Sequence, residues 1–153
     1  MERISALGLD VGRKRIGVAG CDGTGLIATG LVTIERTSFD EDLSQLRKLV
    51  AEREVQILVV GLPYSMDGTL GFQARQVQKF ARRLGFALQL PVEYTDERLT
   101  SVEAEELIRA EARSRSGHFV PSQSHHKSLI DRKAAAIILQ RWLDDRKSQK
   151  PQN

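Results

Sequence analysis

Three acidic residues of this 153-residue chain stand where apolar segments meet polar ones. Asp10 ends an apolar run, Glu97 follows another, and Asp131 comes directly after the apolar pair Leu129-Ile130. A carboxylate beside a hydrophobic core is rare unless a partner or a metal ion compensates its charge. Carboxylates from several elements can hold divalent cations, and two such ions can activate water and stabilise the leaving oxygen of a phosphodiester. These residues therefore indicate metal-dependent phosphodiester hydrolysis.

Each acid also has a purely structural explanation. Asp10 is compatible with a hairpin turn, Glu97 with a position beside a helix cap, and Asp131 with the dipole at a helix N-terminus. The basic run of residues 13–15 suits a phosphate group, although a solvated turn is the alternative. No single residue decides between these interpretations, so the elements that carry the acids matter.

Hydropathy patterning predicts those elements. Apolar runs separated by glycine-rich breaks predict an antiparallel three-stranded meander at the start of the chain, and later apolar runs predict strands that pair in parallel. Amphipathic periodicity predicts the helices. The predicted strands are residues 4–10, 15–21, 26–34, 57–60 and 91–95, and the predicted helices are residues 39–53, a segment around 77–84, 101–113 and 127–144. This order predicts an α/β fold with a mixed sheet covered by helices. Ligand sites of such sheets gather at the carboxyl ends of the parallel strands, where we expect the acids.

Length and composition bound the protein further. Residues 1–144 are expected to form a single domain, followed by a charged flexible tail over residues 145–153. Residues 114–126 are polar and are expected to form a mobile loop.

The net charge of +3 and the pI near 9.2 permit nucleic-acid binding. No apolar run predicts a membrane helix or a signal peptide, so we expect a cytoplasmic protein without a membrane partner. Cys21 is expected in the core.

Five segments, in order along the chain, resemble one bacterial family. They are Leu9-Asp10-Val11-Gly12-Arg13-Lys14-Arg15-Ile16-Gly17-Val18-Ala19, Val59-Val60-Gly61-Leu62-Pro63 with Asp67-Gly68-Thr69, Val77-Gln78-Lys79-Phe80-Ala81, Asp96-Glu97-Arg98-Leu99-Thr100-Ser101 and Ile130-Asp131-Arg132-Lys133-Ala134-Ala135. The chain thereby resembles the Holliday junction resolvase family that is also called the pre-16S rRNA nuclease family.

This resemblance implies an RNase H-like fold and a nuclease for structured nucleic acid, either precursor ribosomal RNA or branched DNA. It implies that Asp10, Glu97 and Asp131 are the catalytic acids and bind two Mg²⁺ or Mn²⁺ ions. Phosphate contacts are expected from Arg13, Lys14, Arg15, Arg98, Lys127 and Arg132. Two symmetric cuts in a junction favour a homodimer, whereas trimming of an RNA end needs one monomer. The alternatives are a non-catalytic nucleic-acid-binding module of the same fold and an actin-like phosphate-binding ATPase domain.

Overall fold

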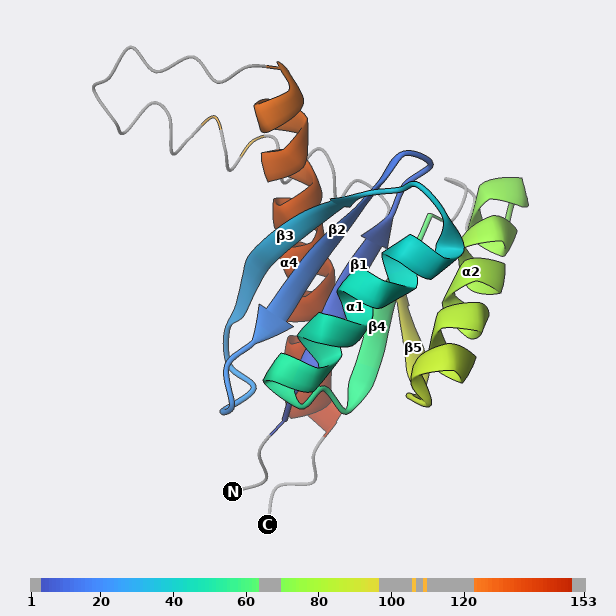
Figure 1. Ribbon diagram of the computed structural model, residues 1–153. Helices are drawn as coiled ribbons and strands as arrows, with labels where there is room; N and C mark the ends of the chain where they lie inside the picture. Colours follow the sequence, from blue (N-terminus) through green and yellow to red (C-terminus); the bar gives the residue numbers. More distant parts are fainter. Residues whose placement is uncertain (1–3, 64–69, 97–105, 107–108, 110–122, 150–153) are drawn as a thin grey trace.

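A mixed sheet forms the centre of the protein, in a computed structural model that describes residues 4–63, 70–96, 106, 109 and 123–149 (Figure 1). Its strands are β1 (Ala6–Val11), β2 (Arg15–Cys21), β3 (Ala28–Glu35), β4 (Ile57–Leu62) and β5 (Val92–Asp96), in the spatial order β3-β2-β1-β4-β5. The first three strands pair antiparallel, whereas β4 joins β1 and β5 joins β4 in parallel. The predicted meander followed by parallel strands is confirmed.

Helices cover both faces of this sheet (Figure 1). α1 (Phe39–Arg53) and α2 (Phe72–Leu88) lie on one face, and the long α4 (Gln123–Gln149) crosses the other. α1 coincides with the helix predicted for residues 39–53. Its first turn is capped as the sequence indicates, because the Ser38 hydroxyl accepts a hydrogen bond of 3.2 Å from the backbone N–H of Glu41. The helix predicted for residues 101–113 lies outside the described residues, apart from residues 106 and 109.

α4 is longer at both ends than the predicted helix of residues 127–144. Residues 123–126 belong to the helix rather than to the predicted loop, and residues 145–149 belong to it rather than to the predicted tail. The apolar stripe that guided the prediction ends at Leu143, but local contacts continue beyond it. Gln140 donates a hydrogen bond of 3.1 Å to Asp144, and the Arg146 guanidinium lies 4.9 Å from the centre of the Trp142 ring.

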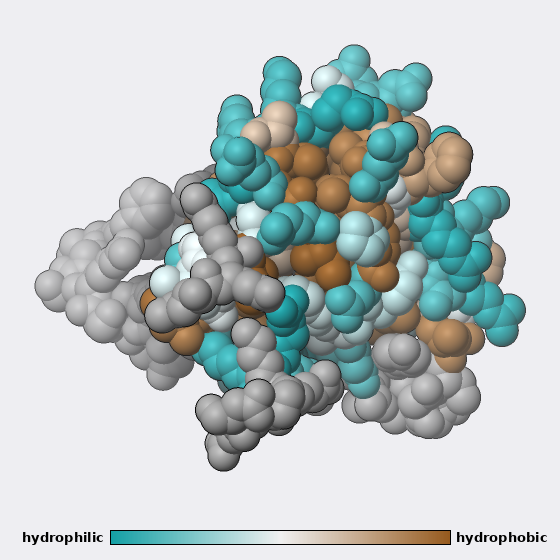
Figure 2. All heavy atoms as spheres, turned by 90° about the horizontal axis from the view of Figure 1, so that it is seen from below, coloured by the Kyte–Doolittle hydropathy of each residue, from teal (hydrophilic) through white to brown (hydrophobic). Residues whose placement is uncertain are grey.

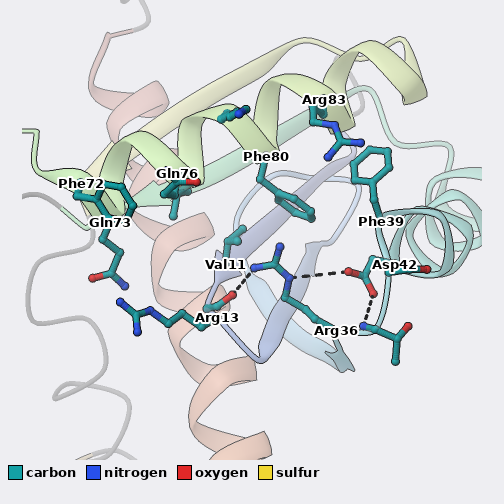
Figure 3. Close-up of a pocket in the computed structure, with 15 residues that line it drawn as sticks. Val11, Arg13, Arg36, Phe39, Asp42, Phe72, Gln73, Gln76, Phe80 and Arg83 are labelled. Carbon is teal, nitrogen blue, oxygen red and sulfur yellow. Dashed lines mark hydrogen bonds and ion pairs between the residues drawn. The ribbon is translucent and has the colours of Figure 1, made fainter.

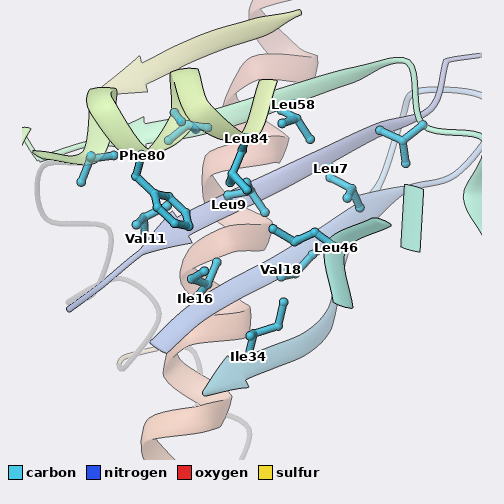
Figure 4. Packing of buried hydrophobic residues seen from close by; sticks show 14 of the residues in the cluster. Leu7, Leu9, Val11, Ile16, Val18, Ile34, Leu46, Leu58, Phe80 and Leu84 are labelled. Atoms are coloured by element: carbon cyan, nitrogen blue, oxygen red, sulfur yellow. The ribbon is translucent and has the colours of Figure 1, made fainter. Parts of the chain in front are cut away.

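Strand alternation divides the core into two clusters. On the face toward α1 and α2, side chains of β1 such as Leu7 and Leu9 pack with Leu46 of α1 and Leu84 of α2 (Figure 4). On the other face, a second cluster joins the sheet to α4 and includes the following residues: Ala6, Ala19, Cys21, Val59, Ala135, Ile138, Leu139, Trp142 and Leu143. Successive residues of a strand point to opposite faces. The even-numbered positions of β1 therefore face α4, and the predicted burial of Cys21 is confirmed.

Glycines allow α4 to lie directly on the sheet. A Cβ atom at Gly8 would stand 2.7 Å from the Cβ of Leu139, and a Cβ atom at Gly30 would stand 3.0 Å from the Cβ of Arg132. Such separations leave no room for a side chain on these strands. The backbone of α4 is therefore held close to β1 and β3, which fixes the depth and the register of every side chain that it carries.

The outer surface is mixed in character. Seen from below, hydrophobic residues gather in the middle of the face and hydrophilic residues surround them (Figure 2). At the β2–β3 turn, the Asp22 carboxylate accepts a hydrogen bond of 2.6 Å from the Thr24 hydroxyl and one of 3.2 Å from the N–H of Ile27. These hydrogen bonds, that from Thr24 foremost, lower the pKa of Asp22. Within the described ranges, every helix is too short or too polar to cross a bilayer.

Candidate active site

Asp10 lies on the central strand of the sheet, one residue before the end of β1. It pairs directly with Gly17 of β2 across the antiparallel ladder. Because Leu9 and Val11 point into the core under α1 and α2, the side chain of Asp10 faces α4. The residue is half-buried. The expected position at the carboxyl end of β1 is confirmed, on the face covered by the last helix.

Asp131 reaches the same place from α4. A Cβ atom at Gly17 would stand 3.1 Å from the Cβ of Asp131 and would overlap its backbone carbonyl. Asp131 therefore lies directly over Gly17, which is the cross-strand partner of Asp10. Neighbouring strands are about 4.8 Å apart. The structure thus brings Asp10 and Asp131 together on one face of the sheet, at one level, although 120 positions separate them in the sequence.

The position of Asp131 within its helix differs from the expectation. The sequence placed it in the first turn, where the helix dipole would explain its charge. α4 begins at Gln123, so Asp131 lies about two turns into the helix. The dipole effect falls off within the first turn, and the dipole explanation is therefore wrong for this residue.

An arginine of β2 holds the Asp131 carboxylate. Arg15 Nε donates a hydrogen bond of 2.7 Å to Asp131 Oδ2, and the two side chains are 26% and 19% exposed. Arg15 had been expected to bind phosphate together with its neighbours. This ion pair lies at the end of the sheet where β1 ends, and the phosphate contact of Arg15 stays a prediction, while Arg13 and Lys14 are exposed at the tip of the turn.

The third predicted acid, Glu97, lies outside the described residues, as does Arg98. What the structure describes is the strand that leads to it. β5 ends at Asp96, at the same edge of the sheet as β1, because β1, β4 and β5 run parallel. α4 is fastened to that end, since Arg141 Nη1 donates a hydrogen bond of 3.3 Å to the Asp96 carbonyl. Sequence patterning gave no signal for this contact of Arg141.

The donors at this edge fit a divalent cation in their chemistry. Asp10 and Asp131 supply hard carboxylate oxygens from two separate elements, which is what Mg²⁺ and Mn²⁺ prefer. No group of three or more His, Cys, Asp or Glu side chains suited to a metal occurs within the described part of the chain. Asp10 and Asp131 could supply part of a ligand set, and the predicted third ligand, Glu97, belongs to the residues that follow β5.

Two further predicted phosphate-binding residues lie on α4. Lys127 is exposed, and Arg132 is half-buried beside β3. Arg132 Nε donates a hydrogen bond of 3.4 Å to the Ser128 carbonyl, and its side chain lines a crevice of about 320 Å³ together with Lys133. The basic side chains of α4 that follow Asp131 therefore lie beside β3, the outermost strand on that side of the sheet.

Comparisons with known proteins agree over nearly the whole chain. Residues 4–145 match the model of the RuvX family, described as Holliday junction resolvase. A protein of Crocosphaera subtropica named "Putative pre-16S rRNA nuclease" is 66% identical over 148 residues, which cover 97% of this chain and 98% of that protein. A protein of the same name from Rippkaea orientalis is 68% identical over 147 residues, covering 96% and 100%.

A solved structure supports the fold independently. The structure of T. thermophilus RuvC in complex with a Holliday junction substrate superposes with a TM-score of 0.58 and 14% sequence identity, covering 95% of this chain and 97% of that one. At this identity the likeness concerns the fold alone. The predicted RNase H-like architecture is confirmed.

Proposed function

Because this chain belongs to the RuvX family of Holliday junction resolvases, it is a nuclease, and we propose that divalent cations held by Asp10, Glu97 and Asp131 drive its phosphodiester cleavage. The substrate proposed is structured nucleic acid, with the 5′ end of precursor 16S ribosomal RNA and the four-way DNA junction as the two candidates. Ribosomal RNA precursors are made in the bacterial cytoplasm, which is the location we propose for this enzyme.

The single observation that carries this proposal is the juxtaposition of Asp10 and Asp131 across Gly17. Two carboxylates that face each other over a glycine repel one another unless a cation lies nearby. Arg15 supplies one positive charge, at 2.7 Å from Asp131. A hairpin cap would explain Asp10 alone, but it would not explain a second half-buried acid delivered to the same level from a distant helix.

The residues have distinct roles in this proposal. Asp10 and Asp131 bind the cations, and Glu97 completes the ligand set from the segment after β5. Bound divalent ions would polarise the phosphodiester and lower the pKa of an attacking water. Arg15 orients Asp131 and limits its repulsion from Asp10, while Arg13, Lys14, Lys127, Arg132 and Arg98 attract the phosphate backbone.

The match to the family over residues 4–145 supports a nuclease over an actin-like ATPase. Such ATPases close two domains of this kind around a nucleotide, and the matched region holds one. The pair of carboxylates supports catalysis over a binding module that has lost its activity, because binding phosphate alone would be weakened by two clustered negative charges.

Cleavage mapping on two substrates tests the proposal. Purified protein is incubated with Mg²⁺ and either a precursor 16S RNA fragment or a four-way junction, with linear duplex as the control. We expect cuts at defined positions in at least one structured substrate and few in the linear duplex. Cleavage of neither substrate, by a protein that is folded, would contradict the proposed function. Two symmetric cuts in the junction would indicate a dimer, whereas a single RNA cut requires one active site.

A further inference from the structure

A second concave site lies on the other side of the sheet from Asp131. A cavity of about 730 Å³ opens between the β1–β2 turn, the start of α1 and the first half of α2 (Figure 3). Its floor is formed by Val11 and by Phe80 of α2. The volume is in the range of sites that enclose a small ligand or a nucleotide. It is too confined for a duplex, which would have to lie across its rim.

The lining of this cavity is strongly basic. Four cations surround it, namely Arg13, Arg36, Lys79 and Arg83. Among the described residues that line it, Asp42 is the one acid, and its side chain is 3% exposed. The Arg36 guanidinium lies 3.8 Å from the Asp42 carboxylate, so the two charges compensate each other. The remaining three cations give the cavity a clear preference for anions.

Two of the cations have structural roles. Arg36 donates a hydrogen bond of 2.6 Å to the Gly12 carbonyl, and its guanidinium lies 4.5 Å from the centre of the Phe80 ring. The Arg83 guanidinium lies 3.9 Å from the centre of the Phe39 ring. Figure 3 shows the Arg36 side chain, from the segment between β3 and α1, beside Asp42 of α1, and the Arg83 side chain reaching from α2 toward Phe39 of α1. These contacts hold the walls of the cavity in place before any ligand arrives.

The other two cations are available to a ligand. Arg13 and Lys79 are exposed, and within the part of the chain that the structure describes their side chains make no hydrogen bond or ion pair. Gln73 and Gln76 stand on the α2 side of the same opening and offer amide donors. Preformed walls with unpaired cations at the rim are suited to a phosphate group, whose oxygens accept several hydrogen bonds at once.

The cavity begins next to the candidate active site. Val11 and Gly12 follow Asp10 directly, and a strand advances by only about 3.3 Å per residue. Arg15 faces α4 and pairs with Asp131, whereas Arg13, two residues earlier, lines the cavity under α2. The β1–β2 turn is therefore a common rim between the two faces of the sheet.

We propose that this cavity binds backbone phosphates of an unpaired substrate strand that leaves the active site across the β1–β2 turn. The inference rests on the proposed function and adds a second contact surface to it. One strand of nucleic acid could thereby be cleaved at the acids and be held on both sides of the turn. The cavity would favour substrates that have a single-stranded flank over fully paired ones.

A charge-matched comparison tests the cavity. Arg13→Gln with Lys79→Gln removes the two cations of the lining that are available to a ligand, and Arg75→Gln with Arg82→Gln removes two exposed cations of α2 that do not line the cavity. Both pairs are placed in an Asp10→Asn background to prevent cleavage, and binding of a structured substrate with a single-stranded flank is measured at several salt concentrations. We expect the cavity pair to weaken binding about 10-fold and to reduce the slope of log K against log salt by about 1.4, because each single-strand phosphate contact contributes about 0.7. The control pair should weaken binding less than about 2-fold.

Chemical protection gives a readout that does not depend on a variant's folding. Lysine acylation followed by mass spectrometry should show that a single-stranded oligonucleotide protects Lys79 and leaves Lys48 of α1 reactive. Equal loss of binding in the two charge pairs would overturn the proposal in favour of diffuse attraction. Protection of Lys79 by inorganic phosphate or a mononucleotide as strongly as by the oligonucleotide would overturn it in favour of a small-anion site. If the parent protein binds no nucleic acid at all, the proposed function fails first and this inference fails with it.

Discussion

At the scale of single residues, Gly17 decides whether two acids can meet. Its missing side chain leaves the space into which the Asp131 backbone fits, and its ladder partner is Asp10. The sequence predicted both acids, because a charged residue at the end of an apolar run is conspicuous. It did not predict the roles of Gly17 and Arg15. Both depend on contacts between β2 and a helix more than 100 positions away, and such contacts leave no local pattern.

Gly17→Ala should damage the site without removing any functional group. The added methyl group would collide with the Asp131 backbone and push α4 away from β2. Overpacking of this kind costs about 1–3 kcal/mol of unfolding free energy. We expect cleavage to fall at least about 10-fold, because displacement by about 1 Å can cost roughly 100-fold in rate. Urea unfolding and cleavage assays measure the two effects.

Gly20→Ala is the matched control on the same strand. A Cβ atom there would meet the end of the Arg53 side chain at 2.8 Å, on the face away from Asp131. That flexible end can move, so cleavage should stay near the parent value. Equal loss of cleavage in both variants would show that the close approach at Gly17 has no special role.

At the scale of elements, the sequence predicted those helix bounds that depend on contacts between residues close together in the chain. The bounds of α1 were predicted because Ser38 caps it and apolar residues recur with helical spacing. The ends of α4 were not predicted, because the apolar stripe of α4 is shorter than the helix itself. Asp131 was consequently predicted near the start of the helix, whereas it lies about two turns after the first residue of α4. The cavity under α2 was also missed, since Lys79 and Arg83 resemble the ordinary polar face of an amphipathic helix.

Ser38→Ala should lower stability through the helix cap alone. The Ser38 hydroxyl accepts the Glu41 N–H, and loss of such a cap typically costs about 1 kcal/mol. Ser44→Ala, at an exposed position within α1, is the control and should be neutral or slightly stabilising because alanine favours helix. Urea unfolding followed by circular dichroism distinguishes the two. An unchanged midpoint for Ser38→Ala would show that the cap contributes nothing measurable.

At the scale of the whole molecule, both faces of one sheet contribute to a single proposed path for nucleic acid. α4 delivers an acid and several cations on one side, and α2 delivers cations on the other. The β1–β2 turn connects the two surfaces. The order of the described strands and helices was predictable from the sequence, and so was the shared edge of Asp10 and Asp131. The sequence did not predict that the two surfaces meet at the β1–β2 turn. That prediction would require knowing on which face of the sheet the side chain of each arginine of the turn lies.

Binding should depend steeply on salt and weakly on base sequence. Phosphate contacts release counterions, and four or more contacts to a single strand give a log–log slope of about −3 or steeper. Fluorescence anisotropy with two unrelated sequences of the same secondary structure, between low and moderate salt, measures both properties. A flat salt dependence would indicate a partner other than nucleic acid.

The most direct test of the central claim compares cleavage by the parent protein and by Asp10→Asn in Mg²⁺, in Mn²⁺ and in chelator. The amide keeps the size of the Asp10 side chain and removes the charge that would hold a cation, so the fold should persist while the shared site is lost. Asp145→Asn makes the same chemical change at an exposed position of α4 and serves as the control. We predict cleavage by the parent protein and by Asp145→Asn with either metal, none by Asp10→Asn, and none by any of the three in chelator. Cleavage by pure Asp10→Asn at the parent rate, or undiminished cleavage in chelator, would contradict the account.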